Sequence, residues 1–485
     1  MPSAFRSALC ALALILVVGP ALAGPGASTA SLTTCAATRT DPDSFPDPFS
    51  RPSAALMAPG ATRSFQIQPN GDLYNGVWSV RITAAEDGRA ATPPHRIAYE
   101  QRWLPVAYWA EHGHALRWDF EAVAQLMPES PLVTLERSIN DAWIAWRDRP
   151  AIAIEQKGLL ERVGDRLDRV EVSSSRRIFL RDDEVRPMAA SFEARVTNPD
   201  RVAHVARLVV RFAEADAPQP WREDLRHRPK PLVWGWADTA ATVAIGIRAR
   251  AEADSLARGI TLAPGESRVI RFVFATHPVP VAKLVDWARA PHEQRVAETR
   301  AFWQREVARG MTLELGDPEV ERAVAAARVV LLSLRERRSG NWVPLGGPFH
   351  YRDVWLRDGA RAIQALALNG YVEESRDMAR GFLTWQWAHG PFVSQSGQLD
   401  GTGQALWVFE QAMLRPYPAP DVDRFARSAW NAVEWCERVR AIDRESGAKF
   451  SNMLPKTDPH DAELVDAQLV GNDAWALAGY RSAER

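Results

Sequence analysis

The hydrophobic pattern of this 485-residue chain changes its period near Pro278, and this change constrains the fold more than any other feature. Before it, from about Pro48 to Thr276, apolar and polar residues alternate. The alternating apolar positions include Trp78, Val80 and Ile82, then Phe192, Ala194 and Val196, then Leu208, Val210 and Phe212, and finally Ile270, Phe272 and Phe274. Such alternation predicts strands with one buried face. Many strands without helical periodicity between them predict a β-sandwich.

After Pro278 the apolar residues follow a helical period. Residues 281–306 predict one or two linker helices. A strong helix is then expected from 317, because Asp317 is a good N-cap and Pro318 suits the first helical position. Further helices are predicted at about 357–369, 371–388, 402–414, 421–441 and 472–483. Together these six helices predict three helical hairpins.

The predicted loops inside these hairpins are longer than the links between them. They run over about 340–356, 389–401 and 442–471, and they are rich in Gly, Pro, aromatic and acidic residues. Long structured loops on one side of a regular scaffold are where functional sites tend to lie. We therefore expect the chemistry of this chain in these three loops.

The first residues are typical of a signal peptide. Arg6 supplies a positive charge, residues 9–18 form an apolar segment, and Ala21-Leu22-Ala23 is a small-x-small cleavage site. An uncleaved anchor is the alternative, but the apolar run is too short to span a bilayer. We therefore expect a periplasmic or secreted protein without a membrane segment after cleavage.

Composition narrows the class of partner. The formal net charge is −1 with both signs interspersed, so the chain lacks the basic footprint of a nucleic-acid-binding protein. Three cysteines, Cys10, Cys35 and Cys436, give neither a disulfide framework nor a Cys-rich metal site. Tryptophan is unusually frequent in this composition, with 19 residues. Indole faces stack on sugar rings and also fill cores, so we expect a carbohydrate partner. We expect neither a metal nor a cofactor.

The first predicted loop carries two Arg-Asp pairs beside aromatic residues. It reads NWVPLGGPFHYRDVWLRDGAR, and Arg357 and Asp358 begin the following helix, with Trp355 just before them. An Arg beside a carboxylate offers fixed donors next to an acceptor, which suits adjacent sugar hydroxyls. The alternative is a helix-start Asp with an incidental salt bridge.

The other two loops offer acidic candidates. Asp400 lies in GQLDGTGQALW, where the alternative is an ordinary Asp-Gly turn with Thr402 capping the helix. The third loop contains Asp458, His460, Asp461, Glu463 and Asp466. A solvated acidic loop is the alternative there. A metal cluster fits poorly, because no second His or Cys has ligand spacing.

These segments resemble the active-site motifs of glucoamylases and related six-hairpin glycosidases of the bacterial glucoamylase type. YRDVWLRDGAR and the helix after it, residues 351–370, resemble the first motif, and GQLDGTGQALW resembles the second. The resemblance implies that Arg357 and Asp358 bind the sugar at the cleavage subsite. It also implies that Trp355 forms part of the subsite wall and that Asp400 is a second sugar-binding position.

HDAELVDAQLVGNDAWALAGY resembles the region around the general acid of these enzymes. The resemblance implies Glu463 as that catalytic acid, with Asp461 and Asp466 as alternatives. The spacing from Glu463 to the next helix is shorter than in the family, and no Trp precedes it.

The implied reaction is inverting hydrolysis of α-glucosidic bonds in oligo- or polysaccharides. One carboxylic acid protonates the leaving oxygen, and a second carboxylate activates water on the opposite face of the sugar. The alternatives are a non-catalytic carbohydrate-binding scaffold, or a trehalase, debranching glucosidase or phosphorylase. A polysaccharide lyase that uses His350 and Tyr351 is a further alternative.

The sequence thus predicts a multi-domain β + α chain: an N-terminal β-sandwich, a linker helix, and a partial (α/α)6 barrel with about three of six hairpins. The predicted bounds are 1–23 for the signal peptide, 24–47 for a flexible leader, 48–278 for the β-sandwich, 279–316 for the linker and 317–485 for the barrel. Three hairpins leave open apolar edges, so we expect a truncated product whose catalytic base follows residue 485. An arc completed by a partner is the alternative.

Overall fold

The computed structural model describes residues 53–128, 186–214, 242–245, 255–276, 279 and 281–485, apart from short internal gaps. The gaps are 76–77, 94–96, 339–340, 350–351, 353, 388–389, 395–397, 414–418, 446–451 and 457–466. The signal peptide and leader predicted before residue 48 lie outside the described residues. None of the described helices combines the length and the apolar character that crossing a membrane requires.

The first sheet has seven strands, and all of its pairs are antiparallel. Its strands lie in the order β1 (Ala54–Leu56), β2 (Phe65–Ile67), β3 (Leu73–Tyr74), β4 (Trp78–Glu86), β10 (His204–Glu214) and β12 (Ser255–Leu262), and β5 (Arg89–Ala90) pairs with β4. β4 and β10 are therefore neighbours although more than a hundred residues separate them in the sequence. This pairing brings the end of β4 against the start of β10.

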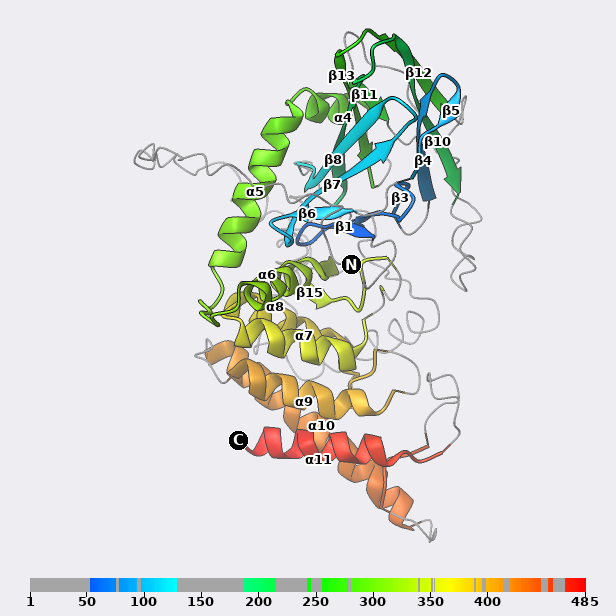
Figure 1. The fold of residues 1–485 in the computed structure, drawn as a ribbon. Helices are drawn as coiled ribbons and strands as arrows, with labels where there is room; N and C mark the ends of the chain where they lie inside the picture. Colours follow the sequence, from blue (N-terminus) through cyan, green and yellow to red (C-terminus); the bar gives the residue numbers. More distant parts are fainter. Residues whose placement is uncertain are drawn as a thin grey trace, which may run out of the picture. The chain divides into compact units, whose positions relative to one another are not determined.

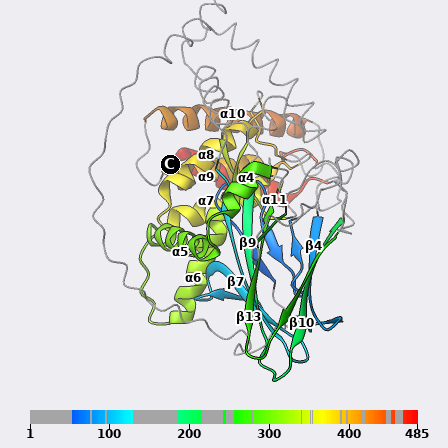
Figure 2. The ribbon, with the colours of Figure 1, turned by 90° about the horizontal axis from the view of Figure 1, so that it is seen from above.

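The second sheet has six strands and includes one parallel pair, β11 with β13. Its order is β11 (Thr242–Ile245), β13 (Ser267–Ala275), β9 (Met188–Thr197), β8 (Arg117–Leu126), β7 (Leu104–His112) and β6 (Ala98–Glu100). Figure 2 shows strands of both sheets, β4 and β10 of the first and β7, β9 and β13 of the second.

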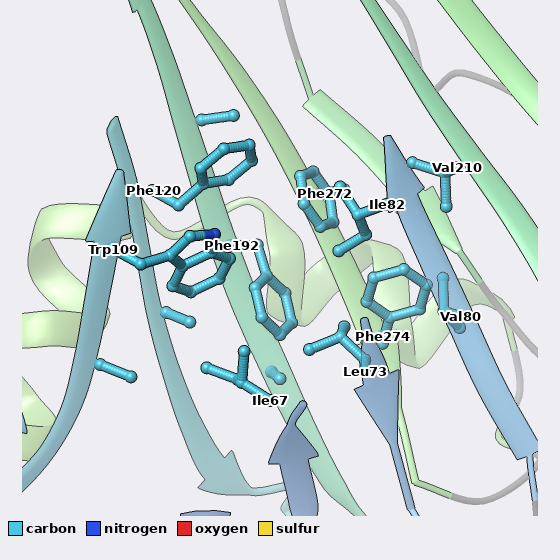
Figure 3. Close-up of a cluster of buried hydrophobic side chains, with 14 of the residues drawn as sticks. Ile67, Leu73, Val80, Ile82, Trp109, Phe120, Phe192, Val210, Phe272 and Phe274 are labelled. Atoms are coloured by element: carbon cyan, nitrogen blue, oxygen red, sulfur yellow. The ribbon is translucent and has the colours of Figure 1, made fainter. Parts of the chain in front are cut away.

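The two sheets share one apolar core, which explains the alternating pattern of the sequence. Figure 3 shows aromatic side chains of the second sheet facing aliphatic side chains of the first. Trp109 stacks on Phe120 with ring centroids 5.0 Å apart. Phe192 stacks on Phe272 at 5.1 Å. Alternate residues of each strand point into this core, so a period of two follows where one face is buried, whereas β7 and β9 are buried on both faces over most of their length.

The second half of the chain is mainly helical. Its elements are α4 (Val281–Ala288), α5 (His292–Ala308), α6 (Pro318–Ser333), β14 (Arg335–Arg338), β15 (Asn341–Pro344), α7 (Leu356–Leu368), α8 (Val372–Phe382), the 3-10 turn η3 (Leu383–Trp385), α9 (Asp400–Met413), α10 (Ala419–Glu445) and α11 (Val470–Glu484). The predicted start of α6 is confirmed, since the Asp317 carboxylate accepts a hydrogen bond from the Glu319 N–H at 2.9 Å.

α9 packs directly against both α7 and α11 (Figure 1). Glycine makes the close approach to α11 possible, because a Cβ on Gly403 would overlap the backbone of Trp475. On the side of α7, the contact is made by buried apolar residues of α7 and α9, among them Ile363 and Phe409. The close packing fixes how the first turns of α7 and α9 face each other.

The fold class predicted from the sequence is wrong. The described residues form the two sheets, one of them with a parallel pair, a two-stranded β14–β15 sheet and eight α-helices, and these helices do not define a partial (α/α)6 barrel. The segment predicted as a linker packs on the second sheet. Leu284 and Trp287 of α4 are buried against Ala189 and Val273. Periodicity identifies which face of an element is buried, but it does not specify the partner that covers that face. The predicted domain boundaries stay predictions.

Glu111 of β7, in the second sheet, gives the stability of the protein a measurable pH dependence. Its side chain is 4% exposed, and burial raises the pKa of its carboxyl to about 8. The ordinary pKa in an unfolded chain is about 4.3. The folded state therefore holds the proton more tightly, and stability falls as the pH rises from about 4.3 to about 8, by at most about 1.4 kcal/mol per pH unit.

We predict that Glu111→Gln removes this part of the pH dependence. Glutamine keeps an oxygen that can accept the hydrogen bond of the Trp109 indole N–H, which is 3.3 Å long. The variant should match the wild type near pH 4 and exceed its free energy of unfolding near pH 9, as measured by urea denaturation at about these two pH values. Parallel pH profiles of the two proteins would contradict the prediction.

Candidate functional site

A partly buried ion pair joins the first turns of α7 and α9. Arg357 is the second residue of α7 and Asp400 the first residue of α9. The Arg357 Nε–H donates to Asp400 Oδ2 at 2.8 Å, and Nη2 lies 2.7 Å from the same oxygen. The Asp400 side chain is 4% exposed and that of Arg357 43%. The carboxylate is thus enclosed while the guanidinium reaches the surface.

Gln404 completes the coordination of this carboxylate. One turn further along α9, its Nε2–H donates to Asp400 Oδ2 at 2.7 Å. A buried carboxylate is costly unless charge and hydrogen bonds compensate it, and here three N–H groups converge on one oxygen. The alternative in which Thr402 caps the helix is wrong, because α9 begins at Asp400 and Thr402 Oγ1 accepts from the Phe392 N–H at 3.1 Å.

Two glutamine side chains beside Asp400 keep unused hydrogen-bonding capacity. Gln398 is buried, and neither its Oε1 nor its Nε2 has a hydrogen-bond partner among the residues that the structure describes. Gln404 Oε1 is likewise buried and unpaired. Buried polar atoms normally have partners, and each one left without a partner destabilises the protein. Both donor and acceptor capacity therefore remain next to the ion pair.

The other residues of the first predicted motif lie around this pair. Trp355 is half-buried immediately before α7, and Asp358 is exposed on its first turn. Arg352 forms an ion pair with Glu336 of β14 at 2.5 Å. Asp353, the expected partner in the second Arg-Asp pair, lies outside the described residues. The structure thus joins Arg357 to the second motif through Asp400.

An aromatic cluster continues from the ion pair, and the sequence analysis missed it. Arg361, one turn after Arg357, places its guanidinium 4.9 Å from the ring centroid of Trp407 and 5.5 Å from that of Trp475. The two indoles are half-buried, with centroids 6.1 Å apart. Helical spacing could have revealed it. Arg361 follows Arg357 by four positions and Trp407 follows Gln404 by three, so each pair lies on one face of its helix.

The candidate acid Glu463 and its alternatives Asp461 and Asp466 lie outside the described residues. The described ends of their loop are anchored. Asp443 of α10 accepts hydrogen bonds from the Met453 N–H at 3.0 Å and from Gln468 Nε2 at 2.9 Å. The Asp473 carboxylate of α11 accepts from the Leu454 N–H at 3.1 Å, and burial raises the pKa of Asp473.

A serine–histidine–glutamate arrangement elsewhere is not an accessible nucleophile site. Ser191 Oγ lies 2.9 Å from His292 Nδ1, and Glu121 Oε2 lies 3.5 Å from His292 Nε2. His292 is only 1% exposed and Ser191 5%, so a substrate does not reach them. The three residues instead connect the second sheet to the start of α5.

Comparison with known proteins adds little to these observations. No family model matches the sequence, and no curated protein matches it. Among solved structures, the chain is similar to the gh92 family glycosyl hydrolase ccman5, at 11% identity and a TM-score of 0.18, over 90% of this chain and 54% of that one. The chain thus spans about half the length of that glycosyl hydrolase.

We predict that Asp400→Ala destabilises the protein by about 2–4 kcal/mol, because the substitution removes the anion that Arg357 and Gln404 bind. Asp358→Ala is the matched control. Asp358 is an exposed acid one residue beyond Arg357, and its replacement should change the free energy of unfolding by no more than about 0.5 kcal/mol. Urea denaturation measures both. Equal effects of the two substitutions would contradict the assigned role of Asp400.

Proposed function

We propose that the chain is a carbohydrate-active protein of the glycoside hydrolase class, and that it binds sugar at the first turns of α7 and α9. The observation that carries the proposal is the convergence of Arg357 and Gln404 on Asp400. Directed donors beside a carboxylate suit adjacent hydroxyls of a sugar ring. The half-buried indoles of Trp407 and Trp475 add apolar surface of the kind that stacks on sugars.

The reaction we propose is inverting hydrolysis of α-glucosidic bonds in oligo- or polysaccharides, by a periplasmic or secreted protein. In this proposal Glu463 protonates the leaving oxygen, and a second carboxylate activates water. Asp358 and Trp355 join Arg357 and Asp400 as sugar-binding residues. We assign Asp400 a sugar-binding role, because its Oδ2 accepts hydrogen bonds from Arg357 and Gln404. Support comes from the resemblance of the three motifs and from the geometry of the ion pair.

A non-catalytic carbohydrate-binding scaffold is the second candidate. The half-buried indoles of Trp407 and Trp475 favour it, because they offer apolar surface to a sugar ring and carry no group that transfers a proton to the leaving oxygen. The two candidates share the sugar-binding residues and differ in whether a general acid acts. A test of Glu463 therefore separates them.

We predict that a version of the protein that includes the catalytic base expected after residue 485 releases reducing sugar from maltooligosaccharides. Glu463→Gln in that protein should lower kcat about 10²–10⁴-fold, since glutamine cannot supply a proton. Glu445→Gln is the matched control, because Glu445 is an exposed acid at the end of α10. Arg357→Ala should weaken substrate binding, measured as a higher KM.

The outcomes separate the candidates. Maltooligosaccharide binding without release, with the same affinity in Glu463→Gln, would contradict hydrolysis and support the binding scaffold. Absence of both binding and release from the folded wild-type protein would overturn the assignment to maltooligosaccharides. Equal loss of activity in Glu463→Gln and Glu445→Gln would contradict the role of Glu463.

A further inference from the structure

Four ionisable side chains gather where β4 ends and β10 begins, in the first sheet and apart from the proposed sugar-binding residues. Glu86 is the last residue of β4, Asp87 follows it, and His204 is the first residue of β10. Asp200 lies in the turn before β10. The antiparallel pairing of the two strands, in which Ala206 is opposite Glu86, brings these residues together.

His204 bridges two of these carboxylates, and a third lies close enough for their ligand atoms to converge on one metal ion. His204 Nδ1 lies 2.7 Å from Asp87 Oδ2 and 3.5 Å from Glu86 Oε1. The other ring nitrogen, Nε2, lies 2.9 Å from Asp200 Oδ2. Glu86, Asp87 and His204 each offer a ligand atom, and these atoms lie within 4.8 Å of one another. A histidine whose second nitrogen is held by a carboxylate is the usual arrangement in metal sites.

Backbone contacts hold both nearby carboxylates in position. Glu86 Oε2 accepts hydrogen bonds from the Ala115 and Leu116 N–H groups at 2.8 and 2.9 Å. Gly113 leaves room for this carboxylate, because a Cβ there would overlap Glu86 Oε2. Asp87 Oδ1 accepts from the Val205 N–H at 2.8 Å, which leaves Oδ2 beside the imidazole.

The charge balance favours a cation. Three carboxylates surround one imidazole, so the group keeps an excess of negative charge even when the ring is protonated. Among the described residues, Arg89 acts electrostatically on Asp87 and His114 acts on Asp200. Solvent reaches the cluster, because the side chains of Asp87 and Asp200 are 49% and 43% exposed and that of His204 is 13% exposed. An ion therefore has a way in.

We propose that Glu86, Asp87 and His204 bind a divalent ion of the zinc class, with Asp200 positioning the imidazole. Zinc–ligand bonds of about 2.0–2.2 Å in a tetrahedron place ligand atoms about 3.4 Å apart. The 3.5 Å between His204 Nδ1 and Glu86 Oε1 matches this spacing, and the separation from Asp87 has to open by less than an ångström. Water supplies the fourth ligand.

The ligand set selects the class of ion. The metal takes the place of the proton on Nδ1, and the Nε2 proton stays on the ring and is donated to Asp200. A nitrogen ligand with two carboxylates suits zinc, whereas calcium and magnesium prefer oxygen ligands alone. The bound ion would link the turn after β4 to the start of β10 and stabilise the first sheet.

The experiment is titration of the metal-free full chain with Zn²⁺ by calorimetry, with Co²⁺ as a spectroscopic probe and Ca²⁺ as a competitor. We predict one saturable Zn²⁺ site, d–d absorption of tetrahedral Co²⁺, and a Tm that rises with Zn²⁺. Asp87→Asn and His204→Gln should each abolish the Co²⁺ spectrum. Asp200→Asn should weaken Zn²⁺ binding about 10–100-fold and keep the spectrum, as expected of a positioning residue.

His112→Gln is the matched control, because His112 is an exposed histidine on β7 that does not belong to the cluster. It should bind Zn²⁺ like the wild type. The proposal is overturned if the wild type shows no saturable site, or if Asp87→Asn, with an unchanged circular dichroism spectrum, binds Zn²⁺ as the wild type does. It is also overturned if Ca²⁺ displaces Co²⁺ at equal concentration.

Discussion

The enclosure of the Asp400 carboxylate is the constraint on which the arrangement of α7 and α9 depends. A charge removed from water must be compensated by partners in fixed positions. Arg357 of α7 and Gln404 of α9 supply them. Because one partner comes from each helix, the same contact that compensates the carboxylate also fixes the relative register of the two helices. The half-buried indoles of Trp407 and Trp475 lie along the same pair of helices, next to Arg361.

Local features of the fold followed from the sequence because they depend on neighbouring residues. The alternation around Trp78 and Phe272 marked β4 and β13, since one face of each strand is buried in the shared core. Asp317 marked the start of α6 through its own carboxylate. Helices near 357, 402 and 472 were placed within two residues of their observed starts. Periodicity and capping are properties of short segments.

Features that depend on residues distant in the sequence could not be predicted from it. The β11 sequence does not indicate its parallel pairing with β13. The β14–β15 hairpin lies in a segment that was predicted to be the end of a helix and a loop. The sequence suggested Asp358 as the carboxylate that acts with Arg357. The carboxylate that Arg357 contacts is that of Asp400, 43 positions away. Likewise, 117 positions separate His204 from Asp87, so the metal-like cluster emerges only from the pairing of β4 with β10.

A double-mutant cycle between Arg357 and Asp400 tests the central claim most directly. The free energy of unfolding would be measured for the wild type, Arg357→Ala, Asp400→Ala and the double variant. Direct interaction between the two side chains predicts a coupling energy of about 1–3 kcal/mol, with the double variant less destabilised than the sum of the single ones. Effects that add to within about 0.5 kcal/mol would show that the two residues act independently and would contradict this account.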